Sequence, residues 1–249
     1  MMKRLRAYGP ALLVICLVLA VWQIYATSGL SNPANLPAPS HIYQALVIQR
    51  AVIWDNSLQT IAETLIGLAL AVMLGGFFGV IIFLSAMLRK AFYPLLVASQ
   101  TVPLIALAPL LLIWFGFGLQ PKVIMVVLYC FFPITIAVAD GLNTADSQLI
   151  DVLKSMRASR WQTLRTVRIP AAAPAFFSGL KISATYAVTG AVVGEYVGAS
   201  QGLGIYLQTA AHSDSINLVF ALITVIVLVS LALVGTVLLL EKHFLAWRA

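Results

Sequence analysis

Long apolar runs alternate with short polar connections over the whole chain. Six runs are candidate membrane helices, because roughly 20 apolar residues in a helix cross the hydrocarbon core of a bilayer. They cover approximately residues 10–25, 58–84, 93–115, 122–139, 175–197 and 218–240. The pattern predicts an all-α fold with six transmembrane helices, and we expect residues 1–249 to form a single transmembrane domain.

The composition is typical of a polytopic membrane protein. Of the 249 residues, 61% are hydrophobic and 9% are charged, and the mean hydropathy is +1.00. This leaves no polar stretch for a separate soluble domain. The first run follows Lys3, Arg4 and Arg6, as in a signal peptide, but no A-x-A cleavage site follows it and five further runs do. We therefore favour an uncleaved first span.

The positions of the basic residues indicate the orientation of the chain. The net charge of +7 would also fit a nucleic-acid-binding protein. Lysines and arginines gather at the two ends and in alternate connections, however, which is typical of cytoplasmic segments. We expect cytoplasmic N- and C-termini, contact with membrane lipid and no nucleic-acid partner. The basic residues outside residues 149–174 that support this are Lys3, Arg4, Arg6, Arg89, Lys90, Lys242 and Arg248.

The connection at residues 149–174 is polar and basic between two apolar runs. Four apolar residues at its start have the i, i+1, i+4, i+7 spacing of one helix face, which predicts a short helix whose apolar stripe needs a partner. They are Leu149, Ile150, Leu153 and Met156. Ser159 and Gln162 have capping-box spacing, so we expect a second helix that starts at Arg160 and ends before Pro170.

This connection resembles the cytoplasmic EAA loop of importer-type ABC permeases. The pattern of that loop is Glu-Ala-Ala, three residues, Gly, nine residues, then Ile-x-Leu-Pro. Counted back from Pro170, the hydrophobic pair falls on Val167 and Ile169, the glycine position on Arg157, and the opening triplet on residues 151–153. An arginine at the glycine position carries a backbone cost on the order of 1 kcal/mol if the left-handed turn of the family is kept.

The resemblance implies a coupling role for residues 147–170. In the family this loop is the coupling helix, which sits in a groove of the ATP-binding subunit. ATP would therefore be bound by that partner, and this chain would bind no cofactor and catalyse no reaction. The residues that the resemblance assigns to coupling are Asp151, Leu153, Met156, Arg157, Ala158, Ser159 and Arg160.

Three further segments resemble one subgroup of these permeases, at residues 99–122, 130–134 (CFFPI) and 194–204 (GEYVGASQGLG). The subgroup imports nitrate, sulfonates, riboflavin and thiamine-precursor pyrimidines. The resemblance implies a type I ABC importer permease of the bacterial inner membrane. Its partners would be an ATP-binding subunit, a periplasmic or lipid-anchored substrate-binding protein and a second permease copy, in a homodimer or with a different permease chain.

Several polar and aromatic residues in the fourth and fifth runs are candidates for the substrate path. They are Glu195, Tyr186, Thr185, Thr189, Tyr129 and Phe132, with Phe131 beside the last. An ionisable group inside a span is by default a functional candidate that faces a cavity. The alternative is that Glu195 lies near the outer end of its span and simply reaches water.

The same residues favour a class of substrate. No Lys or Arg lies deep within a predicted span, whereas hydroxyls, aromatic faces and one carboxylate are available. This set suits a pyrimidine-like thiamine precursor or a related heterocycle such as riboflavin. Residues 194–204 resemble the pyrimidine and riboflavin branch of the subgroup. Nitrate, taurine and alkanesulfonates remain the alternatives.

The predicted spans also carry packing signals. Gly67, Ala71, Gly75 and Gly79 recur every fourth residue, which predicts a smooth helix face for close contact. Thr60 and Glu63 have capping-box spacing, so we interpret Glu63 as a carboxylate at a helix start and not as a substrate ligand. The third run is broken by prolines, which predicts a kinked helix in the interior; they are Pro94, Pro103 and Pro109.

Other functional classes find little support. No lysine follows a glycine, so there is no Walker A motif. Residues 198–202 match G-x-S-x-G, but they follow a membrane helix, whereas a serine hydrolase places this motif after a strand. His41, His212 and His243 lack metal-ligand spacing, so we expect no metal site. An ion-coupled secondary transporter would need buried ionisable relays, and the candidates all lie near span ends: Glu63, Glu195, Asp140 and Lys181.

Overall fold

A computed structural model describes residues 2–29 and 35–246, and that part of the chain is helical without a strand. The side chains of Lys3, Arg4 and Arg6 and the whole of Arg248 lie outside what it describes. The elements are α1 (Met2–Thr27), α2 (Pro39–Ile48), α3 (Arg50–Leu84), α4 (Ala86–Ser99), the 3₁₀-helix η1 (Leu104–Leu107), α5 (Ala108–Phe115), α6 (Leu119–Gly141), α7 (Ser147–Ser155), α8 (Arg160–Thr163), the π-helical η2 (Leu164–Arg168), α9 (Ile169–Tyr196), α10 (Leu203–His212) and α11 (Ile216–Phe244).

The predicted all-α membrane architecture is confirmed, although the span count is not. Among the described residues, four helices are long and apolar enough to cross a bilayer: α3, α6, the continuous helix Arg160–Tyr196, and α11. The pair α4 and α5 adds a fifth if it counts as one bent span. The apolar part of α1 that is described, Leu12–Thr27, falls short of span length, so the sixth span stays a prediction.

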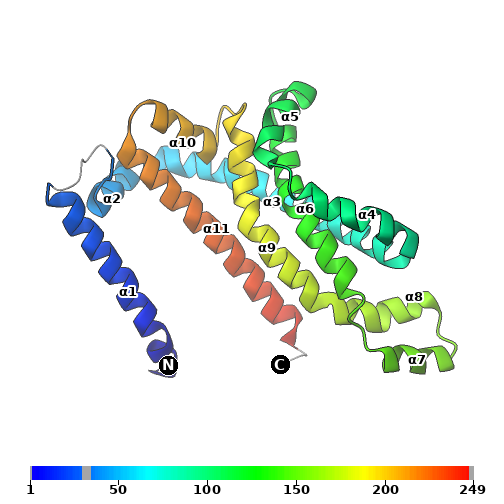
Figure 1. The fold of residues 1–249 in the computed structure, drawn as a ribbon. Helices are drawn as coiled ribbons and strands as arrows, with labels where there is room; N and C mark the ends of the chain where they lie inside the picture. The colour runs from blue at the N-terminus through cyan, green and yellow to red at the C-terminus, as the bar shows by residue number, and fades with distance from the viewer. Residues whose placement is uncertain (1, 30–34, 247–249) are drawn as a thin grey trace.

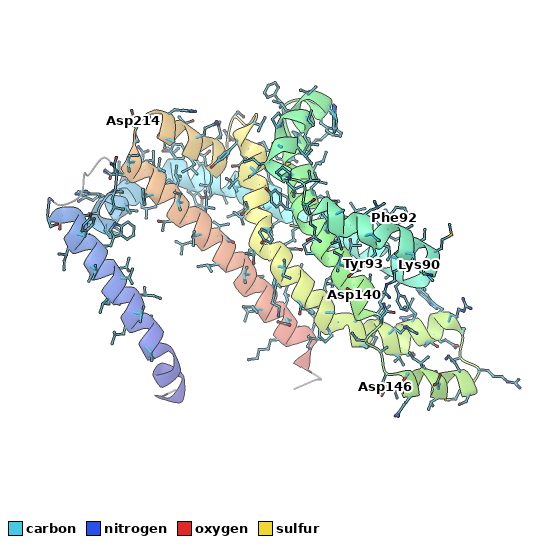
Figure 2. The ribbon with its side chains drawn as sticks, in the orientation of Figure 1. Lys90, Phe92, Tyr93, Asp140, Asp146 and Asp214 are labelled. Atoms are coloured by element: carbon cyan, nitrogen blue, oxygen red, sulfur yellow. The ribbon has the colours of Figure 1, made fainter. Side chains whose placement is uncertain are left out.

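The two termini and the polar connection share one end of the molecule. The start of α1 and the end of α11 lie at the same end as α7 and α8, while α5 and α10 lie at the opposite end (Figure 1). Asp146 at the start of α7 and Asp214 after α10 mark these two ends (Figure 2). The arrangement fits the predicted topology, in which both termini and the loop face the same compartment.

Helix α6 lies at the centre of the fold between α3 and α9. Val126 of α6 is fully buried; a Cβ added at Gly67 of α3 would collide with it, and one added at Gly190 of α9 would lie 3.0 Å from its Cα. Gly75 and Gly79 meet α6 in the same way, at Ile134 and Val138 respectively. The predicted smooth face of α3 is confirmed, and its physical role is to let the backbones of α3 and α6 approach closely.

The third predicted span is bent, as its prolines indicate. The α4 and α5 helices meet at 90°, with Pro103 just before the short η1 segment at the bend. The expectation that this span lies in the interior fits only its second half: α5 buries Ala108 and Leu111, whereas α4 has no buried residue in the single chain. Its main polar attachment is at Asp140 of α6, which accepts hydrogen bonds from Tyr93 and Arg89 at 3.0 and 3.1 Å (Figure 2).

Two predicted helix boundaries are also wrong. Helix α3 begins at Arg50, so Thr60 and Glu63 lie inside it and form no capping box. Helix α8 does start at Arg160, but the chain stays helical past Pro170 up to Tyr196. The π-helical η2 ends at Arg168, so Pro170 lies just after the junction between the π-helical and α-helical parts of one continuous helix.

Candidate functional site

The connection between α6 and α9 folds into two short helices with well-defined caps. The Asp146 carboxylate accepts a hydrogen bond from the Gln148 N–H at 2.8 Å and caps α7. The predicted capping box of α8 is confirmed: the Gln162 N–H donates to Ser159 Oγ at 3.2 Å, and the Ser159 N–H donates to Gln162 Oε1 at 2.7 Å. These caps fix both helices locally in spite of their shortness.

Arg157 makes the left-handed turn expected at this position, where the EAA pattern has glycine. Its φ is +58°, and its N–H donates to the Lys154 carbonyl at 2.9 Å while the Ala158 N–H donates to the Leu153 carbonyl at 2.9 Å. This pair of bonds is a Schellman motif with arginine at the position that favours glycine. The turn is therefore kept, and the strain expected for an arginine there is present.

The two short helices expose an apolar surface, which we call the docking stripe: Leu149, Val152, Met156 and Trp161. Their exposed fractions are 54%, 55%, 72% and 65%. Of the four residues predicted to form the stripe, Ile150 is buried and Leu153 is half-buried. The face of α7 turned outward is thus rotated toward Val152, since Ile150 and Leu153 pack against the protein itself.

The other predicted coupling residues surround this stripe. Asp151 pairs with Lys154 at 2.9 Å on the exposed surface of α7. Arg157, Ser159 and Arg160 are exposed, and Ala158 is half-buried. Charges of this kind at the edge of an apolar patch contribute less to binding than buried apolar anchors.

The Arg168 side chain connects the loop between α6 and α9 to the ends of other membrane helices. Arg168 donates a hydrogen bond from Nη1 to the Leu142 carbonyl at 3.0 Å, and its guanidinium lies 4.7 Å from the ring centroid of Phe83. Phe83 belongs to α3, and Leu142 caps α6. Arg168 therefore connects the helix that begins at Arg160 to the ends of two spans.

A buried polar cluster lies at the other end of the fold, where α3, α6 and α9 meet. Lys122 of α6 forms an ion pair with Glu63 of α3 at 2.7 Å, and Gln59 donates to the same Glu63 oxygen at 2.6 Å. The interpretation of Glu63 as a helix-start carboxylate is therefore wrong. Lys122 lies in the first turn of α6, so it is not deep within a span, but it is buried and paired with Glu63.

Glu195 belongs to this cluster and not to an open surface. Its side chain is fully buried, Oε1 accepts a hydrogen bond from the Thr60 hydroxyl at 2.7 Å, and Oε2 accepts one from the Gly204 N–H. The chain turns back at Gly202 after α9, which brings the start of α10 onto the carboxylate. Two placements were predicted for Glu195, one facing a substrate path and one reaching water at the end of its span. The structure differs from both, because the side chain is enclosed by protein.

The remaining candidate path residues separate into two groups. Thr185, Tyr186 and Thr189 lie together on one exposed face of α9. Tyr129 is half-buried and packs beside Gly190 of the same helix. Phe132 stacks edge-on against Phe131, which in turn contacts Phe78 of α3, so this aromatic group extends toward α3.

Comparison with known proteins assigns the chain to a family. Residues 45–245 match the family described as binding-protein-dependent transport system inner membrane component. The chain belongs to this family. It is 37% identical to a probable ABC transporter permease protein of Haemophilus influenzae over 92% of this chain and 94% of that protein.

Several relatives have names that specify a substrate, and two of them match nearly the whole chain at 34% identity. The permease is 34% identical to the formylaminopyrimidine transport permease ThiX of Halalkalibacterium halodurans, over 100% of this chain and 99% of the relative. It is also 34% identical to the riboflavin transport permease RibX of Chloroflexus aurantiacus, over 96% and 91%. The inward-facing MetNI methionine ABC transporter contains a chain of the same fold, with a TM-score of 0.63 at 19% identity over 82% of this chain and 97% of that chain.

The protein is therefore an ABC transporter permease and a multi-pass membrane protein. Its family carries out transmembrane transport and is not a family of catalytic enzymes. The docking stripe and the buried cluster lie at opposite ends of α6, which starts near Lys122 and ends near the Arg168 contact. Helix α6 is thus the direct connection between them.

Proposed function

We propose that this permease forms the membrane path of an ATP-driven importer in a bacterial inner membrane. A separate ATP-binding subunit binds and hydrolyses ATP and docks on α7 and α8, with both termini in the same cytoplasmic compartment. A second permease copy completes the path, and a periplasmic or lipid-anchored substrate-binding protein delivers the solute. Residues 1–249 act as one transmembrane domain. Family membership and the MetNI likeness in fold support this assembly.

The observation that carries the proposal is the docking stripe beside the Arg157 turn. Three apolar side chains of α7 and its cap, together with Trp161, are more than half exposed on a basic, otherwise polar connection outside the apolar spans. Exposed apolar patches mark sites that bind a protein or the membrane, and the position of this one on a polar connection outside the spans favours a protein partner. The anchoring of Arg168 on α3 and α6 gives such a partner a mechanical connection to the spans.

The test is a charge placed in the stripe. Met156→Asp and Val152→Asp should abolish co-purification with the ATP-binding subunit and ATP-driven uptake, because a buried carboxylate without a partner is costly in an apolar groove. Gln148→Asp adds the same charge to an exposed polar position of α7 and serves as the control. Normal uptake by both stripe variants would contradict the docking assignment. Leu153→Asp should weaken binding of the ATP-binding subunit less than the two stripe variants do, since Leu153 is half-buried within the permease.

For the substrate we propose a pyrimidine-like thiamine precursor or a related heterocycle such as riboflavin. The hydroxyls of Thr185, Tyr186 and Thr189 and the rings of Tyr129 and Phe132 supply hydrogen bonds and aromatic contacts. Within the described spans, Lys122 and Lys181 are both paired with glutamates, which leaves neither free to bind an anion. The names of ThiX and RibX support this choice.

Nitrate, taurine and alkanesulfonates form the second substrate class. Permeases named for aliphatic sulfonates and taurine, from Bacillus subtilis and Escherichia coli, are 30% and 28% identical to this chain. Uptake of labelled aminopyrimidine, riboflavin, nitrate and taurine by the reconstituted complex distinguishes the classes. Transport of nitrate or taurine with neither heterocycle carried would overturn the choice. Uptake driven by an ion gradient without ATP would instead favour a secondary transporter.

A further inference from the structure

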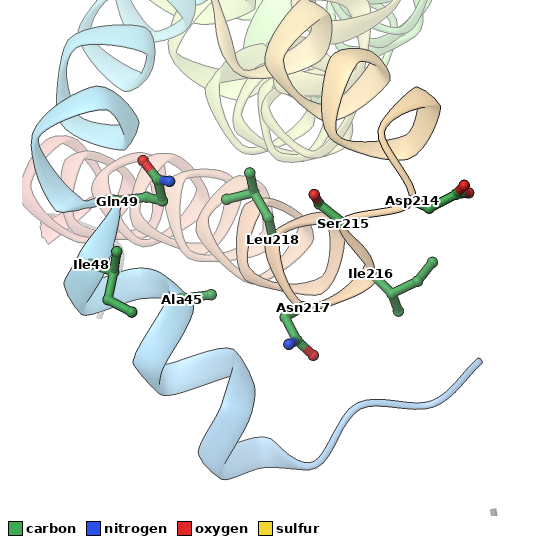
Figure 3. Close-up of a pocket in the computed structure, with 8 residues that line it drawn as sticks. All are labelled: Ala45, Ile48, Gln49, Asp214, Ser215, Ile216, Asn217 and Leu218. Carbon is green, nitrogen blue, oxygen red and sulfur yellow. The ribbon is translucent and has the colours of Figure 1, made fainter. Parts of the chain in front are cut away.

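Helix α10 lies between two unusual turns at the end of the molecule opposite to the docking stripe (Figure 1). Gly202, just before the helix, has a φ of +129°, and Asp214, just after it, has a φ of +51°. A cavity of about 510 Å³ lies at the second turn, lined on one side by Asp214, Ser215 and Asn217 and on the other by Ala45 and Gln49 (Figure 3). The helix is thus a short element with a distinct turn at each end and space beside one of them.

Other helices supply the hydrogen-bond acceptors for the first N–H groups of α10. The Gly202 N–H donates to Asn56 Oδ1 at 2.7 Å, the Leu203 N–H donates to Thr60 Oγ1 at 2.8 Å, and the Gly204 N–H donates to Glu195 Oε2. These N–H groups have no acceptor within their own helix. We call the three side chains Asn56, Thr60 and Glu195 the α10 latch.

Glu195 and Thr60 form the buried centre of the latch. Both are fully buried, and the Thr60 hydroxyl donates to Glu195 Oε1 at 2.7 Å while it accepts from the Leu203 N–H. A Cβ at Gly202 would overlap the Glu195 carboxyl group, and one at Gly204 would lie 2.8 Å from its Oε2. The two glycines therefore form a backbone cradle around the carboxyl group, at a helix N-terminus that favours negative charge.

The latch also connects α10 to the centre of the fold. Thr60 and Glu63 lie one turn apart on α3, and Glu63 is paired with Lys122 at the start of α6. Gly194 of α9 packs against the backbone of Lys122, where an added Cβ would lie 2.9 Å from its Cα. A change in the relative positions of α3, α6 and α9 therefore alters the acceptors that hold α10.

We infer that Glu195 and Thr60 are positioning residues of the transport cycle, which hold α10 over the outer ends of α3 and α9 and release it when the spans rearrange. This inference rests on the proposed ATP-driven function. It gives Glu195 a role that differs from lining a substrate path. Hydrogen bonds suit such a role because they are directional and are lost over a small displacement, whereas apolar packing weakens gradually.

The position of α10 can be followed with a cysteine on its buried face. Ala210 is 2% exposed and packs with Ile53, Leu203 and Leu222. We would place Ala210→Cys in a background with Cys16→Ser and Cys130→Ala, in the full complex with its ATP-binding subunit reconstituted in lipid vesicles. The labelling rate with a maleimide reagent is measured with and without ATP and vanadate, beside the uptake of labelled aminopyrimidine and riboflavin.

The decisive variants are Thr60→Val and Thr64→Val. Both replace a buried threonine of α3 by a residue of similar shape, but the Thr64 hydroxyl bonds only to the Thr60 carbonyl of its own helix. In the wild type and in Thr64→Val, nucleotide should change the labelling rate. In Thr60→Val the rate should rise at least about ten-fold, because the hydrogen bonds of the Thr60 hydroxyl to Glu195 and to the Leu203 N–H are both lost, and it should no longer respond to nucleotide. Glu195→Gln keeps an oxygen acceptor and should give an intermediate rate.

A purely structural role would lower stability without removing the response to nucleotide. The inference is overturned if Thr60→Val and Thr64→Val respond equally to nucleotide, or if wild-type labelling is constant while uptake is normal. The labelling comparison needs no transported solute. An absence of ATP-driven uptake in the wild type would instead count against the proposed function, so the two failures are distinguishable.

Discussion

Lys122 Nζ lies 2.7 Å from Oε1 of Glu63, an ion pair between α6 and α3 among buried residues. The two side chains are 8% and 0% exposed, and Oε2 of Glu63 has no hydrogen-bond partner in the described part of the chain. A pair of opposite charges at this depth is costly unless each partner stays in place. It therefore fixes α3 and α6 in one register beside the α10 latch.

Removal of one partner of this pair should destabilise the permease strongly. Lys122→Met leaves Glu63 buried and unpaired, with an expected loss of about 3 to 5 kcal/mol in the free energy of unfolding. The double variant Lys122→Met, Glu63→Met should recover much of it. Lys154→Met, at an exposed pair with Asp151, is the control and should leave the unfolding midpoint of the detergent-purified protein unchanged. A double variant as unstable as Lys122→Met would contradict this account.

The close contact between α3 and α6 should depend on the absence of a Cβ at Gly67. Gly67→Ala would place a methyl group 2.6 Å from Cγ1 of Val126, which is fully buried, so we expect a loss of about 1 to 3 kcal/mol. Gly76 lies on the same helix with nothing within 4 Å of an added Cβ, and Gly76→Ala should leave stability unchanged or raise it. Thermal unfolding in detergent compares the two. Equal unfolding midpoints for Gly67→Ala and Gly76→Ala would show that α3 and α6 can move apart without loss of stability.

The turn at Arg157 should tolerate glycine and reject a β-branched residue. Arg157→Gly relieves the left-handed strain and should keep docking, whereas Arg157→Val should weaken it by about 1 to 2 kcal/mol, or roughly 5- to 30-fold in affinity. Binding of the purified ATP-binding subunit to each variant in detergent measures this. Arg165→Val changes an exposed arginine of η2 that is not among the predicted coupling residues and serves as the control. Comparable affinities for Arg157→Val and Arg165→Val would show that the turn is not needed.

The two ends of the molecule should be accessible from opposite sides of the membrane. Ser147 at the start of α7 and Ser213 after α10 are both exposed and lie at opposite ends of the fold. In intact cells an impermeant reagent should label Ser213→Cys and not Ser147→Cys, and the reverse should hold for inside-out vesicles. Ser85→Cys extends the same test to the connection before α4, and Gln120→Cys extends it to the first turn of α6. Labelling of Ser147→Cys from outside would refute the topology.

Much of the architecture was predictable because its signals are local. Runs of apolar residues marked α3, α6, α9 and α11, and the Ser159 and Gln162 pair marked the start of α8, since both patterns depend on a single segment. The spacing of Gly67, Gly75 and Gly79 at multiples of four residues also predicted a face for close helix contact. The sequence did not identify the helix that packs against this face, which the structure shows to be α6.

The partners of buried charges were decided only by the tertiary structure. The local pattern of Thr60 and Glu63 indicated a helix start, but α3 extends back to Arg50, and both side chains bond to residues more than 50 positions away. The burial of Glu195 depends on the chain reversal at Gly202, which brings the first N–H groups of α10 onto its carboxyl group. The sequence alone determined which residues can carry charge and where helices are apolar. Which charges meet depends on the packing of helices distant in sequence, because electrostatic partners are set by distance in space.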